Sequence, residues 1–481
     1  MSILPSSIID TLLNDDPDAA QWDVVIRDDE RVKELLKQGI CDGLLADDWF
    51  DPDDLLQLSL DMGAFEVFCT LPDTRKRRSI PASHFSKILL AGALPDQRSL
   101  RQIGRTVFNS APTLDKLGMN FVMTRKGGKR TGDERPFDVE AMGDYFADLT
   151  AAQYSTHALT LASWLCEQSE LQSSTWAMDG LDVRVPAGRG CAEDRHFKLI
   201  VLSVIIDGRA IPFLWHYCTG KDGEITLAKQ LWKNAIKLWG KGACRQLLID
   251  AGFINGPWLK QLHAQGTEVI TRIREKMEPF VFAVACVDTD AEQKWEQVPI
   301  PKRPKGHERP LQREITGLQE WPGWDTYGQN LAICLVRDTY ASGEVDTWCT
   351  MSTDPTASAL KIYEAFKLRW QIEEIFMALS LYHGINDLPA SRIGVACARL
   401  QAIFFAYTVR WLCRQRAQQQ EDESGVKKPW RRKVNLFILY ADGYFAILKA
   451  SVFMEIILNH LDVWHARKDI ILRALRYCEG G

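Results

Sequence analysis

A run of strand-like segments in the middle of the chain constrains the fold more than any other sequence feature. Three successive stretches are rich in β-branched and aromatic residues, namely Trp176–Val185, His196–Ile206 and Ala210–Cys218. Asp207–Arg209 (DGR) separates the last two and is typical of a hairpin turn. The pattern therefore predicts a sheet that begins with hairpin-connected strands.

The segments that follow alternate between helix and strand. In order, they are a helix over Glu224–Leu238, a strand over Cys244–Asp250, a helix over Gly256–Gln265 and a strand over Glu268–Arg274. Hairpin strands followed by such alternation predict a mixed α/β sheet, in the order of a ribonuclease-H-like core. Residues 275–340 contain Pro299, Pro301, Pro304, Pro310 and Pro322 and predict an insertion of short strands or loops. Two further strands and a long helix from about Ala357 to Tyr382 resume the core.

The charge is divided unevenly along the chain. The net charge is −5, but residues 1–62 contain 16 acidic and four basic side chains, so they carry −12 and the rest carries +7. An acidic leader thus precedes a basic body, and the net charge does not exclude nucleic acid. The leader invites the hypothesis that it shields the basic surface or tempers DNA binding.

Cations gather in short runs that suit phosphate contacts. Three runs stand out: Arg75, Lys76, Arg77 and Arg78; then Arg125, Lys126, Lys129 and Arg130; then Lys427–Lys433. Each equally fits a solvated surface loop. Between the first two runs, His84–Ala93 and Ser99–Phe108 have helical spacing. They fit either a helix-turn-helix module or a plain helical pair.

Three carboxylates occupy structurally meaningful places. Asp179 lies in the first strand, Asp250 ends the fourth, and Glu373 lies in the long helix four residues after Arg369. In this core the first and fourth strands are neighbours, so a helix packed on the sheet can bring Glu373 to the two aspartates. Carboxylates held together repel unless hard divalent cations offset them, and such cations promote phosphodiester cleavage. Each Asp also fits a turn or helix-cap role, and Glu373 fits a solvated helix face.

The residues around these carboxylates resemble the DDE transposases of bacterial insertion sequences, in the cut-and-paste group. Three motifs carry the resemblance: Trp176–Gly180 (WAMDG), Leu247–Phe253 (LLIDAGF) with Arg272 further on, and Arg369–Phe376 (RWQIEEIF). In that group a Tyr precedes the Arg by three residues and a Lys follows the Glu by seven. Phe366 and Ser380 stand at those positions here and put the usual grip on DNA phosphate in question.

The resemblance implies a concrete chemistry. Asp179, Asp250 and Glu373 would hold Mg²⁺, with Mn²⁺ as a substitute. Water would cleave the transposon end, and the freed 3′-hydroxyl would attack target DNA. The residues that would contact DNA are Arg369, Trp370, Arg272 and the basic runs, and Trp321 or Trp324 would stack on an unpaired base. Ordinary hydrophobic packing is an equal explanation for the two insertion tryptophans.

The implied partners are double-stranded DNA, as terminal inverted repeats and as target, and a second copy of the chain on that DNA. Two other functions stay open: a transposase-derived DNA-binding protein without catalysis, and a metal-dependent nuclease without strand transfer. The 12 cysteines are scattered without zinc spacing, the N-terminus lacks a basic signal region, and Ala402–Cys413 is too short an apolar run to cross a bilayer. We therefore expect no membrane association and a cytoplasmic, nucleoid-associated protein.

The pattern changes divide the chain into six regions. They are an acidic N-terminal leader (1–62), a helical DNA-binding region (63–168), the first part of the catalytic core (169–274), a β-rich insertion (275–345), the second part of the core with the Glu helix (346–415) and a helical C-terminal region (416–481). The expected fold class is α/β, a ribonuclease-H-like mixed sheet with a β-rich insertion between helical terminal regions.

Overall fold

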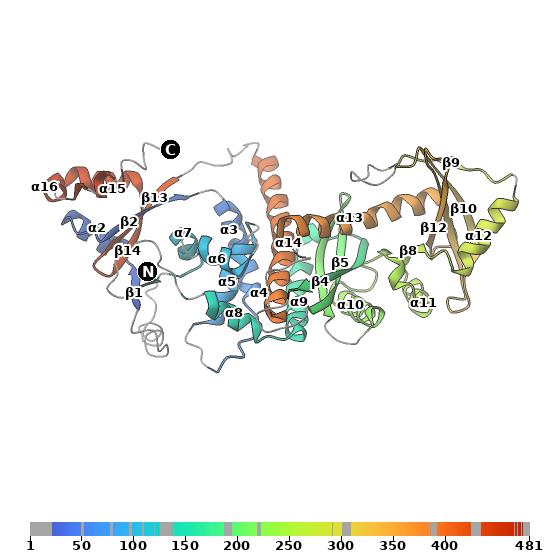
Figure 1. The fold of residues 1–481 in the computed structure, drawn as a ribbon, viewed down its shortest axis with the longest axis horizontal. Helices are drawn as coiled ribbons and strands as arrows, with labels where there is room; N and C mark the ends of the chain where they lie inside the picture. The colour runs from blue at the N-terminus through green and yellow to red at the C-terminus, as the bar shows by residue number, and fades with distance from the viewer. Residues whose placement is uncertain are drawn as a thin grey trace. The chain divides into compact units, whose positions relative to one another are not determined.

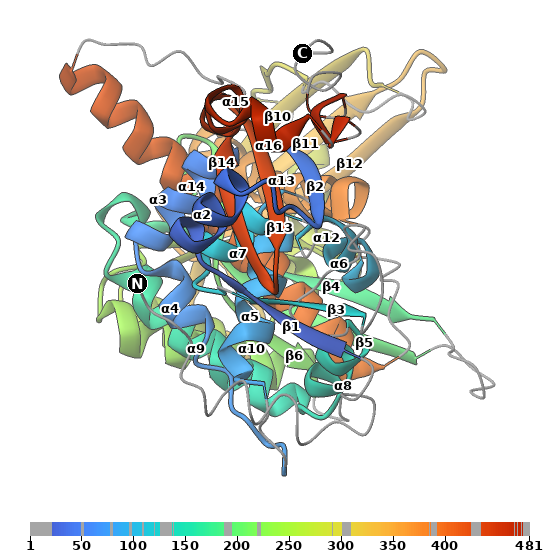
Figure 2. The same ribbon diagram turned by 90° about the vertical axis from the view of Figure 1, so that its left-hand side faces the viewer.

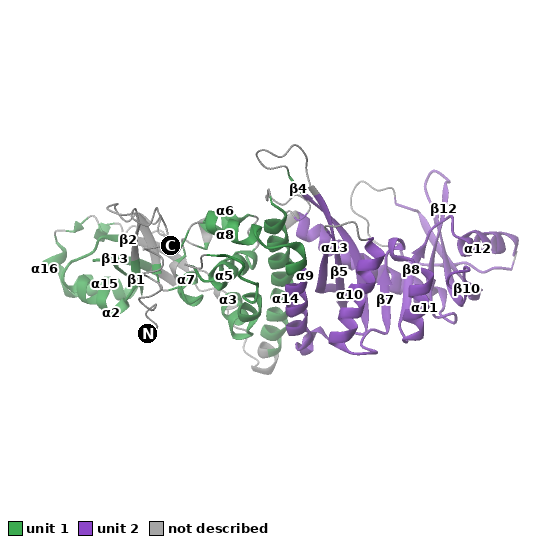
Figure 3. Ribbon diagram, turned by 90° about the horizontal axis from the view of Figure 1, so that it is seen from below, with its two compact units in different colours: residues 1–154, 185–193, 388–481 green, residues 155–184, 194–387 purple. Residues whose placement is uncertain are grey.

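The computed structural model describes residues 22–474 with gaps. The gaps are residues 50–51, 77–79, 96–98, 108–109, 120, 126–136, 138, 187–194, 219–222, 291, 301–308, 384, 386–391, 425–433, 466, 469 and 473. The chain divides into two compact units (Figure 3). Unit 1 comprises residues 1–154, 185–193 and 388–481, and unit 2 comprises residues 155–184 and 194–387.

Unit 2 is built on one nine-stranded sheet with the order β6-β5-β4-β7-β8-β12-β11-β10-β9 (Figure 1). The strands are β4 (Thr175–Val185), β5 (Arg195–Ile206), β6 (Arg209–Cys218), β7 (Gln246–Ile249), β8 (Glu268–Ile273), β9 (Glu296–Gln297), β10 (Gln312–Pro322), β11 (Asn330–Thr339) and β12 (Val345–Ser352). The first five follow the expected ribonuclease-H-like order, with β4, β7 and β8 parallel to one another. The mixed α/β fold class is therefore confirmed.

The hairpin between β5 and β6 forms where the sequence predicts it. Asp207 and Gly208 both have positive φ, 50° and 70°. That pair of conformations defines a type I′ turn, whose twist matches the strands it joins. β5 and β6 then pair antiparallel from Ile206–Arg209 to Lys198–Cys218.

The insertion continues the sheet of unit 2 instead of forming a separate one. β12 pairs antiparallel with β8, β11 with β12, and β10 with β11. The expectation of strands is met, but residues 275–345 also contain a helix, α12 (Glu278–Thr289), that packs on β10 and β11. Pro279 at its first turn favours a helix start, a signal that the proline count of the whole segment obscures.

Helices cover the sheet of unit 2. They are α9 (Ala151–Cys166, which starts in unit 1), η2 (Ser169–Leu171), α10 (Glu224–Trp239), η3 (Ala251–Phe253), α11 (Gly256–Ala264) and α13 (Ala359–His383). α13 contacts strands from β6 at one edge through β7 and β8 to β10. One long helix thus crosses most of the sheet, and it carries the third predicted carboxylate.

Unit 1 contains a second sheet, with the order β2-β13-β14-β1-β3 (Figure 2). Its strands are β1 (Trp22–Arg27), β2 (Gly43–Trp49), β3 (Phe121–Arg125), β13 (Val434–Ala441) and β14 (Tyr444–Lys449). β2 pairs antiparallel with β13, and β1 pairs parallel with β14. α2 (Asp29–Lys37), α15 (Ala450–Asn459) and α16 (Leu461–Trp464) pack on it around one hydrophobic core.

This sheet corrects the expectation for both ends of the chain. The C-terminal region is not wholly helical, because β13 and β14 form a hairpin at Asp442–Gly443, both with positive φ. That Asp-Gly pair, between two apolar runs, is the signal for a type I′ hairpin. The acidic residues 22–61 likewise form strands and helices of the same folded unit.

Residues 63–168, which the sequence predicts to be helical, contain the strand β3 as well as helices, and the remainder of unit 1 is helical. Its helices are α3 (Pro52–Asp61), α4 (Ala64–Phe68), α5 (Ala82–Ala93), α6 (Leu100–Thr106), α7 (Ala111–Lys116), α8 (Val139–Ala147) and α14 (Ile393–Ser424). α5 and α6 are the two short helices predicted, and a Cβ at Gly92 would lie 2.4 Å from Ile103. α14 contacts α3, α5 and α8.

Among the described residues, one helix is long and apolar enough to cross a membrane. It is Ile393–Gln419 of α14, longer than the apolar run noted in the sequence. Within the fold, 83% of its most apolar window is buried. The core helix of a water-soluble domain shows the same property, so the feature is weak evidence for a membrane.

Candidate active site

Asp179 and Asp250 are placed side by side by strand pairing. β4 and β7 run parallel, and their last paired residues are Met178 and Ile249. Asp179 and Asp250 each follow directly in the chain, at the carboxyl end of β7 and in the adjoining part of β4. Neighbouring strands lie about 4.8 Å apart, so the two side chains emerge at one point of the sheet. The order that the sequence predicts for the two strands is thus confirmed.

Local hydrogen bonds hold both aspartates. Asp250 Oδ2 accepts from the backbone N–H of Gly252 at 3.1 Å and caps η3, while Asp179 Oδ1 accepts from the N–H of Gly180 at 2.7 Å. The cap role considered for these aspartates is therefore real at Asp250. It uses one oxygen and leaves the carboxylate on the pocket wall, so the cap and site roles are compatible.

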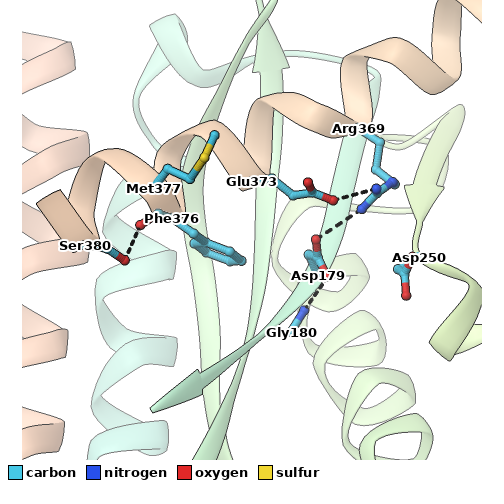
Figure 4. Close-up of a pocket in the computed structure, with 8 residues that line it drawn as sticks. All are labelled: Asp179, Gly180, Asp250, Arg369, Glu373, Phe376, Met377 and Ser380. Atoms are coloured by element: carbon cyan, nitrogen blue, oxygen red, sulfur yellow. Dashed lines mark hydrogen bonds and ion pairs between the residues drawn. The ribbon is translucent and has the colours of Figure 1, made fainter. Parts of the chain in front are cut away.

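Glu373 reaches the aspartates from α13, through Arg369 on the same helix. One terminal guanidinium nitrogen of Arg369 donates to Glu373 Oε1 at 2.6 Å, and the other lies 3.3 Å from Asp179 Oδ2. Figure 4 shows the guanidinium between these two carboxylates, with Asp250 beside them. Arg369 is only 6% exposed. The expected ion pair with Glu373 exists, but it is buried and bridges two elements.

These side chains line one pocket of about 750 Å³. The lining residues are Asp179, Gly180, Asp250, Arg369, Glu373, Phe376, Met377 and Ser380. The sequence did not point to Phe376 and Met377 as site residues. Their spacing of seven or eight from Arg369 places them on the same face of α13, which is the signal that could have found them.

Burial dominates the electrostatics of Asp179. Loss of water contact raises the pKa of its carboxyl to about 6, and the charges of Asp250 and Glu373 add to the rise. Arg369 and the Gly180 N–H lower it. Burial and the neighbouring carboxylates thus make the ionised form of Asp179 less stable, and binding of a further cation would stabilise it.

The donor set suits a hard divalent cation, which prefers carboxylate oxygens. In the described part of the chain, no three His, Cys, Asp or Glu side chains lie close enough together to hold one metal ion. At Asp179 and Glu373 a cationic group already stands in, since Arg369 binds both. The residues therefore fit a metal by chemistry and charge, with the guanidinium in the space between two of the three donors.

Phe366, where the resembled group has Tyr, has a clear packing role. It is 5% exposed, its ring lies 6.0 Å from that of Trp348, and the Arg369 guanidinium lies 5.4 Å from its centroid. Ser380, in the place of the Lys, donates its hydroxyl to the carbonyl of Phe376 at 2.7 Å. Trp370 is 49% exposed, with Arg369 5.8 Å from its ring.

The other residues predicted to contact DNA have varied environments. Arg272 is exposed on β8, and its guanidinium lies 5.6 Å from the Trp348 ring. Arg75 is not free, because it pairs with Asp73 at 2.9 Å and donates to the carbonyl of Ile80. Lys76 is exposed. Arg125 ends β3, at the edge of the unit 1 sheet.

Several predicted cations lie outside the described residues. They are Arg77, Arg78, Lys126, Lys129, Arg130 and the run Lys427–Lys433. Their contacts with DNA stay predictions.

The two insertion tryptophans are partly buried near the turn between β10 and β11. Trp324 stacks on Tyr327 with ring centroids 5.2 Å apart, and Trp321 follows an irregularity in the pairing of β10 with β11. The same turn touches the start of α11, where a Cβ on Gly256 would meet Thr326 at 2.5 Å. Neither tryptophan lines the carboxylate pocket.

Comparison with known proteins agrees with this geometry. Residues 171–409 match the family described as "Transposase DDE domain". That range contains all three carboxylates and Arg369. Residues 171–409 therefore belong to the DDE transposase family.

Two other comparisons add little. A solved piggyBac transposase synaptic complex with hairpin DNA is similar at 11% sequence identity and a TM-score of 0.35, over 78% of this chain and 86% of that chain. No curated protein matches the chain.

Proposed function

We propose that this transposase cleaves DNA at the ends of an insertion sequence and joins the freed 3′-hydroxyl to target DNA. One observation carries the proposal: Asp179, Asp250 and Glu373, from β4, the end of β7 and α13, line a single pocket. Family membership over residues 171–409 supports the same reading.

The three carboxylates would hold Mg²⁺, or Mn²⁺ in its place. A divalent cation at this position supplies Lewis-acid stabilisation of the phosphate oxygens and lowers the pKa of attacking water. Asp179 and Asp250 sit on the sheet and fix the position of the pair, while Glu373 approaches from the helix above it. Arg369 is the residue suited to grip the phosphate, because guanidinium matches phosphate geometry with two hydrogen bonds.

The exposed groups around the pocket support a polyanionic partner. Trp370 presents an open aromatic face next to Arg369, and Arg272 is exposed on the neighbouring strand β8. We propose double-stranded DNA as the partner, as terminal inverted repeats and as target. Pairing of two ends calls for two copies of the chain on DNA. The compartment would be the cytoplasm, at the nucleoid.

The test uses the full-length protein and a DNA fragment that carries the native flanks of its gene. With Mg²⁺ or Mn²⁺, we expect cuts at both element ends and, on addition of plasmid, joined products. Glu373→Gln should abolish both while leaving binding of the fragment nearly unchanged. Glu374→Gln, on the exposed neighbour in α13, is the matched control and should keep activity.

The outcomes separate the three functions. Cuts without joined products would identify a metal-dependent nuclease. Binding of the ends with no cut in either metal would identify a DNA-binding descendant that has lost catalysis. Phe366 and Ser380 depart from the family pattern and so bear on this last outcome. Ser380→Lys should tighten DNA binding if a cation at this position binds phosphate.

A further inference from the structure

Arg369 occupies a position that its packing defines closely. Its guanidinium lies between Asp179 and Glu373, 5.4 Å from the Phe366 ring and 5.8 Å from the Trp370 ring. Its Nε is buried and has no hydrogen-bond partner within the described structure. The side chain therefore gives up one hydrogen bond in order to place both terminal nitrogens on carboxylates.

Charge explains why the side chain lies there. Three carboxylates meet at the pocket, and one guanidinium offsets at most one of their charges. Arginine stays protonated at any pH a protein survives, so it cannot relieve competition by losing its proton. A second cation that binds the same oxygens, Asp179 Oδ2 and Glu373 Oε1, must push the guanidinium aside.

We propose that Arg369 is a resident counter-cation, which a divalent metal must displace and which becomes available to a DNA phosphate only when displaced. The inference rests on the proposed function. As the site stands, Arg369 is 6% exposed and both terminal nitrogens are engaged, so it offers little to a phosphate. Metal entry frees it.

The arrangement links metal and DNA. A phosphate that binds the displaced guanidinium keeps it from competing with the metal. The metal in turn occupies the carboxylates, so that they no longer compete with the phosphate for the guanidinium. Each ligand then raises the affinity for the other by the same factor. The metal-free, DNA-free protein is thereby kept inactive, with its carboxylates partly neutralised.

Metal affinity without DNA tests the inference directly. Binding of Mn²⁺ to the full-length protein is measured by calorimetry, and free Mn²⁺ by electron paramagnetic resonance. Arg369→Gln should bind Mn²⁺ at least about tenfold more tightly than wild type, the equivalent of one charge-assisted hydrogen bond no longer in competition. Arg369→Lys separates displacement from simple charge. It keeps the positive charge but lacks the two-pronged geometry, so it should also bind Mn²⁺ more tightly, by a smaller factor.

A matched control removes the same charge from the surface of unit 2. Lys198 pairs with Asp182 at 3.7 Å and with Glu224, away from the pocket-lining set. Lys198→Gln should change the Mn²⁺ affinity by less than about twofold, since exposed ion pairs carry little energy. Thermal unfolding gives a second readout: Mn²⁺ should raise the melting temperature of Arg369→Gln more than that of wild type.

The results distinguish failure of this inference from failure of the proposed function. Mn²⁺ affinity equal to or weaker than wild type in both Arg369 variants would overturn the inference and leave the metal site intact. An affinity for Mn²⁺ that is raised in Arg369→Gln but unchanged in Arg369→Lys would also overturn the inference. Any positive charge near the pocket would then have the same effect, whether or not it bridges the two carboxylates. No Mn²⁺ binding in any variant, or binding that survives Asp250→Asn and Glu373→Gln, would overturn the metal site itself.

Discussion

Two arginine–carboxylate pairs in unit 2 have opposite designs. Arg313 on β10 meets one partner, Asp338 on β11, with two hydrogen bonds of 2.5 and 2.6 Å, and the two residues are 5% and 1% exposed. Arg369 divides its guanidinium between two carboxylates and has a third nearby, at the wall of a pocket. The first pair balances its charge, and the second does not.

The surroundings match the difference. Trp348 Nε1 donates to Asp338 Oδ2 at 3.2 Å, and the Arg313 guanidinium lies 5.4 Å from the Trp348 ring. The hydroxyl of Tyr363 on α13 is 3.4 Å from Arg313. A balanced, closed pair joins the strands of the insertion to α13, whereas the unbalanced cluster further along the same helix has a charge left over for a ligand. Four experiments test this contrast.

We expect the strongest change in the activity that depends on the unbalanced cluster. Asp250→Asn should reduce DNA cleavage by on the order of 10³ or more, because metal assistance contributes several kcal/mol to such reactions. Its circular dichroism spectrum should match that of wild type. Cleavage is measured on the native element ends, with Asp346→Asn on the exposed end of β12 as the control. Activity within tenfold of wild type would remove Asp250 from the site.

The balanced pair should matter for stability. Asp338→Ala leaves the buried Arg313 guanidinium without its carboxylate partner and should lower the free energy of unfolding by about 3–5 kcal/mol. Urea denaturation measures this free energy. Asp346 lies opposite Asp338 in the β11–β12 pairing and is exposed, so Asp346→Ala is the matched control and should cost less than about 1 kcal/mol. Equal losses in the two variants would show that burial of the pair has no special weight.

The unbalanced cluster should reveal itself in the pH dependence of stability without metal. The pKa of Asp179 is raised in the fold to about 6 from its ordinary value of 3.8, so the folded protein binds more protons than the unfolded chain between these values. Stability from this group is present below about pH 4 and is lost as pH rises through about 6, by up to about 3 kcal/mol.

Asp179→Asn should flatten that part of the profile, measured by urea denaturation from pH 4 to 7 in a chelating buffer. The groups that face Asp179 are Arg369, Asp250 and Glu373. Asp182→Asn, three residues along β4 and exposed, provides the control. If the free energy of unfolding depends on pH in the same way in Asp179→Asn as in wild type, the charge of Asp179 is already offset in the folded protein.

The smallest effect tests the link from the balanced pair to α13. Tyr363→Phe removes the hydroxyl that lies 3.4 Å from Arg313 and donates to the carbonyl of Pro299 at 3.3 Å. It should lower the free energy of unfolding by about 0.5–1.5 kcal/mol. Tyr340→Phe, at the turn between β11 and β12, shows what loss of a tyrosine hydroxyl costs elsewhere. A larger loss at Tyr340 would argue against a stabilising link.

The core of unit 2 could be predicted from the sequence because its signals are local. The strand around Asp179 and the strand before Asp250 are apolar runs, and parallel pairing of neighbours then brings the two residues together without further information. The position of Arg369 could be predicted from the sequence only in part. Its spacing of four from Glu373 is visible, but its second bond, to Asp179, depends on how α13 lies over the sheet, which no local pattern encodes.

The terminal sheet could not be read in the same way. The Asp442–Gly443 hairpin has a local signal, whereas the pairing of β13 with β2 joins residues almost 400 positions apart in the chain. Only tertiary packing specifies such a contact. The balanced pair was equally hidden, since Arg313 and Asp338 look like ordinary charged residues until β10 and β11 pair.

The terminal sheet also has a consequence for the order of events during synthesis. β1 and β2 leave the ribosome before the DDE domain, but β13 and β14, with which they pair, leave after it. β2 therefore waits without its partner while the DDE domain is made, whereas β1 can pair earlier with β3. The sheet closes only after that domain has been made. Closure of so long a loop is slow and costs entropy. Removal of residues 1–62 would leave the C-terminal hairpin without a partner on either side, so such a deletion measures the loss of a domain as well as the loss of negative charge.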